Sequence, residues 1–61
     1  MINLNENFTV NNQEYTMVKE SNLLKPETNS QMGWCKKANG SKLFSFVVKN
    51  NGQILVSKVG V

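Results

Sequence analysis

The stretch that decides the fold is NGSKLFSFVVKNNG, residues 39–52. Its run Ser41–Lys49, with the expected strand at Lys42–Lys49, is rich in aromatic and β-branched residues and lies between two Asn-Gly pairs. Asn-Gly between β-prone runs is the strongest short-range hairpin signal, because a type I′ turn needs positive φ at both central residues. We therefore predict two hairpins that share this central strand, with partner strands at Met32–Ala38 and Gln53–Val59.

A second alternating pattern lies near the start of the chain. Its apolar members are Leu4, Phe8 and Val10, and they alternate with polar residues. Asn11-Asn12 supplies a turn, since Asn tolerates the left-handed region, and Glu14–Lys19 returns as the second strand. A two-residue loop sets Phe8 opposite Tyr15, which is a favourable aromatic pair across two strands.

The segment Ser21–Gln31 joins the two halves. Pro26 and the polar residues after it predict a connection, with one helical turn at Asn22–Lys25. Five short strands in 61 residues predict one small β domain over residues 1–61. We expect an all-β, five-stranded antiparallel barrel or curled sheet, SH3-like or OB-like, made of an N-terminal hairpin and a C-terminal three-stranded meander.

Two-residue loops at both Asn-Gly pairs fix which side chains share a face. They pair Cys35 with Phe44 and Gly33 with Phe46, and they pair Val48 with Leu55 and Phe44 with Val59. The predicted core face carries Cys35, Phe44, Phe46, Val48, Leu55 and Val59, and Gly33 leaves room for the ring opposite. The other face carries Met32, Trp34, Lys36, Leu43, Ser45, Val47, Lys49, Ile54, Val56 and Lys58. A slip of one residue would exchange the two faces.

The composition narrows the range of functions. There is no His and only one Cys, which excludes a histidine base, a Cys-His pair, a cysteine zinc cluster and an internal disulfide. Cys35 is the strongest nucleophile, but it faces the predicted core and has no base beside it. We expect no enzyme activity, no cofactor and no metal. We also expect no signal peptide, no membrane span and, from the lone Cys, a cytoplasmic location.

The charge is divided unevenly along the chain. Residues 1–30 hold four Glu and two Lys, a net of −2, whereas residues 31–61 hold five Lys and no acidic residue, a net of +5. This basic half predicts an anionic partner, foremost nucleic acid. The expected phosphate contacts are Lys36, Lys37, Lys42, Lys49 and Lys58, with Trp34 as a stacking platform. The absence of Arg favours recognition of single strands or of shape over recognition of base sequence.

One segment resembles a known nucleic-acid-binding strand. In Lys42–Lys49 the residues Lys42, Phe44, Phe46 and Val47 match the RNP1 pattern of RNA-recognition motifs, and cold-shock domains have a similar basic-aromatic strand. Leu43, Ser45 and Lys49 depart from the pattern. The resemblance implies that aromatic side chains of this strand stack on bases, whereas the register predicted above places both Phe side chains in the core.

Other interpretations remain open from the sequence. In one alternative, the lysine side chains are merely solvated or protect a strand edge against aggregation, and Trp34 is a core or lid residue. Alternatively, Trp34, Met32 and Tyr15 anchor a protein interface and the lysines attract an acidic partner, as in a phage or mobile-element protein that inhibits a host protein, such as a nucleic-acid enzyme, in the host cytoplasm. An exposed strand edge is a third means of binding. A core this small would also gain from oligomerisation, which the sequence leaves open.

Overall fold

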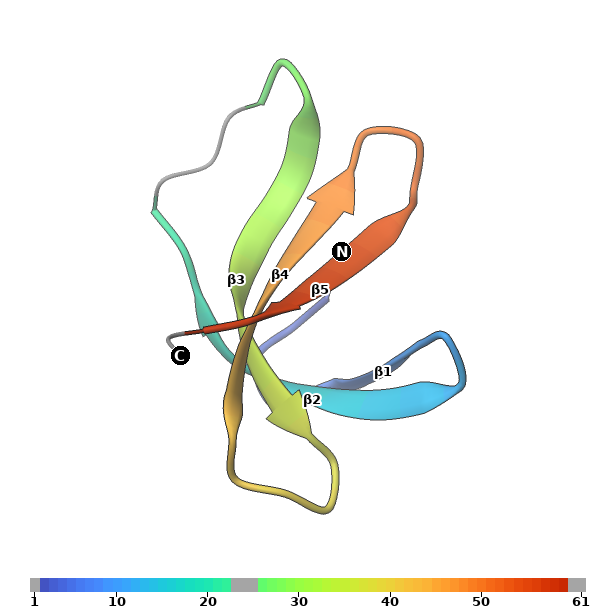
Figure 1. The fold of residues 1–61 in the computed structure, drawn as a ribbon. Coiled ribbons are helices and arrows are strands. Elements are labelled where there is room, and N and C mark those ends of the chain that lie inside the picture. Colours follow the sequence, from blue (N-terminus) through green and yellow to red (C-terminus); the bar gives the residue numbers. More distant parts are fainter. Residues whose placement is uncertain (1, 23–25, 60–61) are drawn as a thin grey trace.

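The computed structural model describes residues 2–22 and 26–59 and contains one antiparallel sheet (Figure 1). The strands are β1 (Asn7–Val10), β2 (Gln13–Glu20), β3 (Asn29–Lys37), β4 (Leu43–Lys49) and β5 (Ile54–Lys58). They lie in the sheet in chain order, each beside its sequence neighbours. The described residues include no helix that could cross a membrane. The prediction of a five-stranded antiparallel all-β fold is therefore confirmed.

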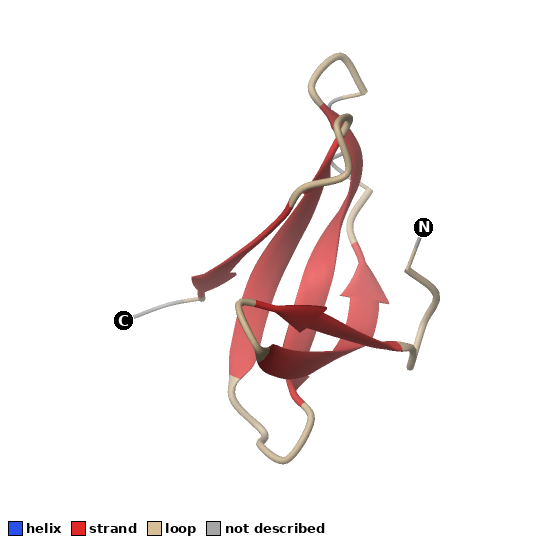
Figure 2. Ribbon diagram, turned by 90° about the vertical axis from the view of Figure 1, so that its right-hand side faces the viewer, coloured by secondary structure: helices blue, strands red, loops and turns tan. Residues whose placement is uncertain are grey.

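The sheet curls into a half-barrel, which is consistent with a small SH3-like or OB-like architecture. Figure 2 shows the β1–β2 hairpin folded across the lower part of β3 and β4. The concave side encloses the core, whose buried apolar residues are Ile2, Tyr15, Met17, Cys35, Phe44 and Phe46. The Phe8 and Phe46 rings, 5.3 Å apart between centroids, connect the first hairpin to the meander across this concave side.

The first hairpin forms as predicted at its turn. Asn11 and Asn12 both have positive φ, 52° and 67°, which is the requirement of a type I′ turn. Phe8 lies opposite Tyr15 with ring centroids 5.8 Å apart. Leu4 does not continue the strand, because the chain turns at Asn5, whose φ is 66°. Leu4 is left exposed, and Ile2 is the N-terminal side chain that enters the core.

The centre of the sheet depends on a missing side chain. Gly33 lies opposite Phe46, as predicted, and Phe46 is 1% exposed. A Cβ atom on Gly33 would lie 2.9 Å from Cε1 of the Phe46 ring and would overlap the backbone oxygen of Lys19. Strands β2, β3 and β4 therefore meet here at a distance that only glycine allows.

The predicted register between β4 and β5 is wrong by one residue. The loop consists of Asn50, Asn51 and Gly52, with Gly52 at φ 92°, rather than of two residues. The Lys49 carbonyl accepts the Gly52 N–H at 2.9 Å and the Lys49 N–H donates to the Gln53 carbonyl at 2.7 Å, the pattern of a three-residue hairpin with a bulged glycine.

The extra loop residue exchanges the two faces of β5. Val56 lies opposite Phe46 and Ile54 opposite Val48, so Ile54 and Val56 pack against the core. Leu55 and Val59, which we expected in the core, are instead 43% and 40% exposed. The cause is the strict two-residue period of a strand, in which a shift of one position moves every side chain to the opposite face.

The first Asn-Gly pair gives the predicted register through a different turn. Cys35 lies opposite Phe44, but neither Asn39 nor Gly40 has positive φ, so the loop is not of type I′. Residues 38–42 form a wider loop, in which the Gly40 N–H donates to the Lys37 carbonyl at 3.0 Å. The helical turn expected at Asn22–Lys25 falls on residues 23–25, which lie outside the described residues.

A buried amide holds the N-terminal segment against the sheet. Gln31 is 3% exposed, and its Nε2 donates to the Ile2 carbonyl at 2.7 Å and to Glu20 Oε2 at 2.9 Å. Its Oε1 accepts the Ile2 N–H at 2.9 Å. A buried polar group is stable only when it is paired, so these bonds determine where residue 2 enters the core.

Adding one methyl group at Gly33 tests the close approach of the three strands. We expect Gly33→Ala to lower the free energy of unfolding by about 1–3 kcal/mol or more, because the core must expand around the new atom. The matched control is Gly40→Ala, whose Cβ would meet Lys37 Cβ at 3.5 Å and the Lys37 backbone oxygen at 4.0 Å, both ordinary contacts. Urea unfolding followed by circular dichroism measures both variants, and equal stabilities would contradict this account of the core.

Candidate nucleic-acid interface

The convex side of the meander carries the candidate interface, which we call the outer face. On β3, β4 and β5 it consists of Met32, Trp34, Lys36, Leu43, Ser45, Val47, Lys49, Leu55, Ser57 and, directly after β5, Val59. It differs from the predicted mixed face only in and directly after β5, where the shifted register puts Leu55, Ser57 and Val59 in place of Ile54, Val56 and Lys58. No acidic residue occurs in β3, β4 or β5.

Trp34 lies near the middle of the outer face and is half-buried. Ser45 is its partner on β4, and Ser57 is the partner of Ser45 on β5. The side chains directly across the sheet from Trp34 on β4 and β5 are therefore small and polar. Trp34 is therefore partly accessible on the outer face.

A β-bulge brings Lys19 beside Trp34. Met17 pairs with Cys35 and Lys19 pairs with Trp34, so Val18 is the extra residue of β2. The bulge changes the alternation, and Lys19 leaves the core side and places its Nζ 5.7 Å from the centroid of the Trp34 ring. We did not predict Lys19 as a site residue. The sequence does contain an indication of the bulge. Strict alternation would place Lys19 on the same buried face as Tyr15 and Met17, which is an unfavourable position for a lysine.

The structure separates the lysines that we had grouped as one phosphate-binding set. Lys36 and Lys49 lie on the outer face, and Lys42 lies in the β3–β4 loop. Lys37 and Lys58 belong to the opposite side, since Lys37 lies 5.8 Å from the Phe44 ring centroid and Lys58 pairs with Phe44. Across the described residues, no lysine forms an ion pair with a carboxylate. The lysine charges are therefore available to a partner on two sides of the sheet.

The resemblance to the RNP1 strand does not extend to its exposed aromatic residues. Phe44 and Phe46 are both buried on the concave side, where they pack in the core. They cannot stack on bases while the fold is intact. In this sheet the aromatic residue that reaches the outer face is Trp34, on the neighbouring strand.

The two alternative interface anchors lie on different sides. Met32 is half-buried on the outer face, opposite Val47. Tyr15 is buried in the core, with its ring 5.8 Å from Phe8 and 5.7 Å from Phe44 between centroids. The aromatic ring of Tyr15 therefore serves the core, and only the edge of this residue reaches the surface.

Cys35 lies in the centre of the core, as predicted. Its side chain is 0% exposed, and burial raises the pKa of its thiol to about 11. A thiol with this pKa stays protonated at neutral pH, and the thiolate is the nucleophilic form. Among the described residues, no three Cys, Asp or Glu side chains come together in a group that could hold a metal ion.

Comparison with known proteins finds no match among protein-family models, curated proteins or solved structures. The class that the fold defines is a small five-stranded antiparallel half-barrel.

The raised pKa of Cys35 leads to a prediction about stability at alkaline pH. The unfolded thiol ionises near its ordinary pKa of 9.0 while the folded thiol remains protonated to about 11. The unfolded state therefore binds fewer protons in this window, and the free energy of unfolding should fall as the pH rises from 9 to 11. We expect this fall to be smaller in Cys35→Ala, measured by urea unfolding at several pH values.

Thiol labelling gives an independent check at pH 8. The disulfide reagent DTNB should modify folded Cys35 far more slowly than Cys35 in guanidinium chloride, because reaction requires the core to open. Equal labelling rates in the two solutions would contradict the buried position.

Proposed function

We propose that this protein is a non-enzymatic binding module that holds single-stranded nucleic acid on its outer face. The observation that carries the proposal is the partly accessible Trp34, set in a sheet whose strands β3–β5 carry lysines and no acidic residue. Aromatic stacking beside a cationic surface is the common arrangement for single strands, since every base has a π-face and every nucleotide a phosphate.

The outer-face lysines are spaced around Trp34 in a way that suits a backbone passing over it. Lys19 lies on the β2 side of the ring, and Lys36 is two positions along β3 on the same face. Lys49 lies at the far end of β4. Three such contacts give modest affinity and a log–log salt slope of about −2, since each phosphate neutralised on a single strand contributes about −0.7.

The chemistry of the cations also limits what is recognised. All the basic residues are lysines, and the chain contains no Arg that could form a bidentate contact with guanine. Lysine acts as a mobile point charge that contacts phosphates in any sequence. The proposed activity is therefore binding with little preference for sequence, favouring single strands over duplexes.

The single Trp makes the proposal directly measurable. Titration with oligo(dT) at about 50 mM salt should quench the fluorescence of Trp34, because a stacked base replaces solvent over the ring. With a fluorescein-labelled oligonucleotide, Trp34→Ala should weaken binding at least 5-fold, and Trp34→Phe should weaken it less. Unchanged affinity in Trp34→Ala would exclude Trp34 as the stacking residue.

Substitutions at two neighbouring lysines distinguish binding at the outer face from a general effect of net charge. Lys36→Glu should weaken oligonucleotide binding at least 10-fold and reduce the salt slope. Lys37→Glu changes the net charge by the same amount one residue along, but on the opposite side of the sheet, and should have a clearly smaller effect. If both variants lose affinity equally, binding is diffuse attraction to a basic protein, and the proposed face is wrong.

A protein partner is the second candidate, and a specific observation favours it. Leu43, Leu55 and Val59 are 40–43% exposed, and all three lie on the outer face with Met32. Exposed apolar side chains rimmed by lysines fit an acidic protein surface, as in a phage or mobile-element protein that modulates a host protein. Recovery of a defined protein from nuclease-treated host extract, lost in Leu55→Glu, would support this candidate. Recovery that is unchanged in Leu55→Glu would exclude the outer face as the interface.

A further inference from the structure

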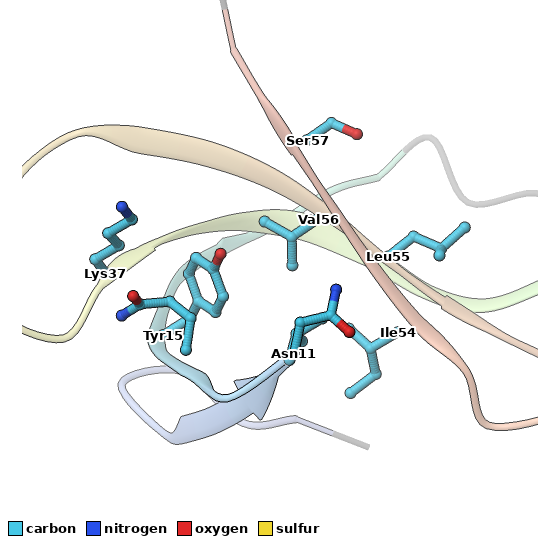
Figure 3. A pocket seen from close by; sticks show the side chains of 9 residues that line it. Asn11, Tyr15, Lys37, Ile54, Leu55, Val56 and Ser57 are labelled. Atoms are coloured by element: carbon cyan, nitrogen blue, oxygen red, sulfur yellow. The ribbon is translucent and has the colours of Figure 1, made fainter.

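The half-barrel has an open seam between its first and last strands. β1 and β5 occupy the two ends of the strand order and touch without pairing. Beside this contact lies a cleft of about 510 Å³, lined by Val10, Tyr15 and Lys37 on one side and by residues 54–57 of β5 on the other. Figure 3 shows the Val56 and Ile54 side chains pointing toward Tyr15 and Asn11, while Ser57 and Leu55 point away.

The backbone of β5 presents free hydrogen-bonding groups at this seam. The Lys49 N–H donates to the Gln53 carbonyl, so Gln53 directs its backbone toward β4. Along an antiparallel strand the backbone N–H and C=O groups of successive residues point alternately to the two sides of the strand. Those of Leu55 and Ser57 therefore also face β4. Those of Ile54, Val56 and Lys58 therefore face the open edge, where the strand order ends.

The side chains at the seam match this backbone pattern. Ile54 and Val56 are half-buried and form an apolar floor together with Val10. The Tyr15 hydroxyl forms no hydrogen bond to any described residue, and Lys37 forms no ion pair. An apolar floor, an unpaired hydroxyl and a lysine without a carboxylate partner thus line the cleft beside one unpaired strand edge.

We propose that the β5 edge and the adjoining cleft bind an extended acidic peptide segment of a partner protein by strand addition. The segment pairs with the free backbone groups of Ile54, Val56 and Lys58. Its inward side chains are apolar over the cleft floor, and an inward carboxylate at the end of the segment lies beside Lys37. Strand addition of this kind takes affinity from the main chain and specificity from alternate side chains.

Charge complementarity selects this occupant over a second copy of the chain. Lys58 lies on the edge strand itself and Lys37 lies in the cleft, whereas β5 carries no acidic residue. Lysine on an edge strand discourages pairing with an equally basic copy, and it attracts an acidic segment. This site lies on the opposite side of the sheet from Trp34, so it does not depend on the proposed nucleic-acid function.

A designed peptide tests the inference without knowledge of the natural partner. The probe is acetyl-Glu-Thr-Val-Thr-Val-Thr-Glu-amide, in which Glu and Val share one face and Thr the other in either strand direction. In ¹⁵N-labelled protein, titration should shift the amide signals of Ile54, Val56 and Lys58 and slow hydrogen exchange at Val56 about 10-fold or more. Replacing both Glu residues of the peptide by Lys should weaken binding at least 10-fold.

Protein variants provide matched controls. Val56→Pro removes the outward N–H without breaking a bond to β4 and should abolish binding, whereas Val56→Thr keeps the N–H and should retain it. Lys37→Glu should weaken binding of the acidic peptide and favour the Lys-containing peptide. Should Val56→Pro fail to fold, a peptide N-methylated at its central residues removes the same bonds from the other side and should not bind the wild-type protein.

Several outcomes would overturn the proposal. They are the absence of shifts at millimolar peptide, equal binding by Val56→Pro and Val56→Thr, equal binding of the acidic and basic peptides, and shifts confined to the outer face around Trp34. Shifts at β5 that depend on protein concentration without peptide would also overturn it, since the occupant would then be a second copy.

Discussion

The rest of the structure depends on the contact between Phe46 and Gly33. Because no side chain stands on Gly33, the Phe46 ring can lie against the backbone of β3, and the Lys19 carbonyl can approach from β2. The close approach lets the sheet curl far enough for Phe8 of β1 to reach Phe46. A flat sheet of this size would leave both faces exposed to solvent. The curl therefore creates the core in so short a chain.

The curl gives the two sides of the sheet different roles. The concave side collects the Phe and Tyr rings and Cys35, whereas the convex side carries Trp34 with lysines, small polar residues and partly exposed apolar side chains. The same curl stops before the barrel closes, and β1 and β5 touch without pairing. The outer edge of β5 therefore remains unpaired, and Lys58 on this strand discourages pairing with a second copy of the chain. The protein thus has two separate surfaces, a lysine and tryptophan face and an open strand edge, and we propose an anionic partner of a different kind for each.

Irregular positions decide which side chains reach these surfaces. The bulge at Val18 moves Lys19 to the outer face, and the bulged Gly52 moves Ile54 and Val56 into the core. Each is a shift of one residue in a pattern whose period is two, so each reverses every position beyond it. The shifted register at Gly52 is why Lys58 leaves the outer face, whereas Lys36 and Lys37 lie on opposite sides through the ordinary alternation of β3. The bulge at Val18 is why Lys19, absent from the expected set, stands beside the indole.

The sequence by itself determined the strand count, the antiparallel order, the Asn11-Asn12 turn, the Phe8–Tyr15 pair and the Gly33–Phe46 pair. These features rest on local signals, namely turn residues and alternation within a single run, which act whatever the rest of the chain does. Only the tertiary structure decided the faces of β5, the place of Lys19 and the closure of the sheet. The first two depend on where one extra residue is accommodated, at Val18 and in the loop that ends with Gly52. The third depends on contacts between residues far apart in the chain, such as that of Phe8 with Phe46.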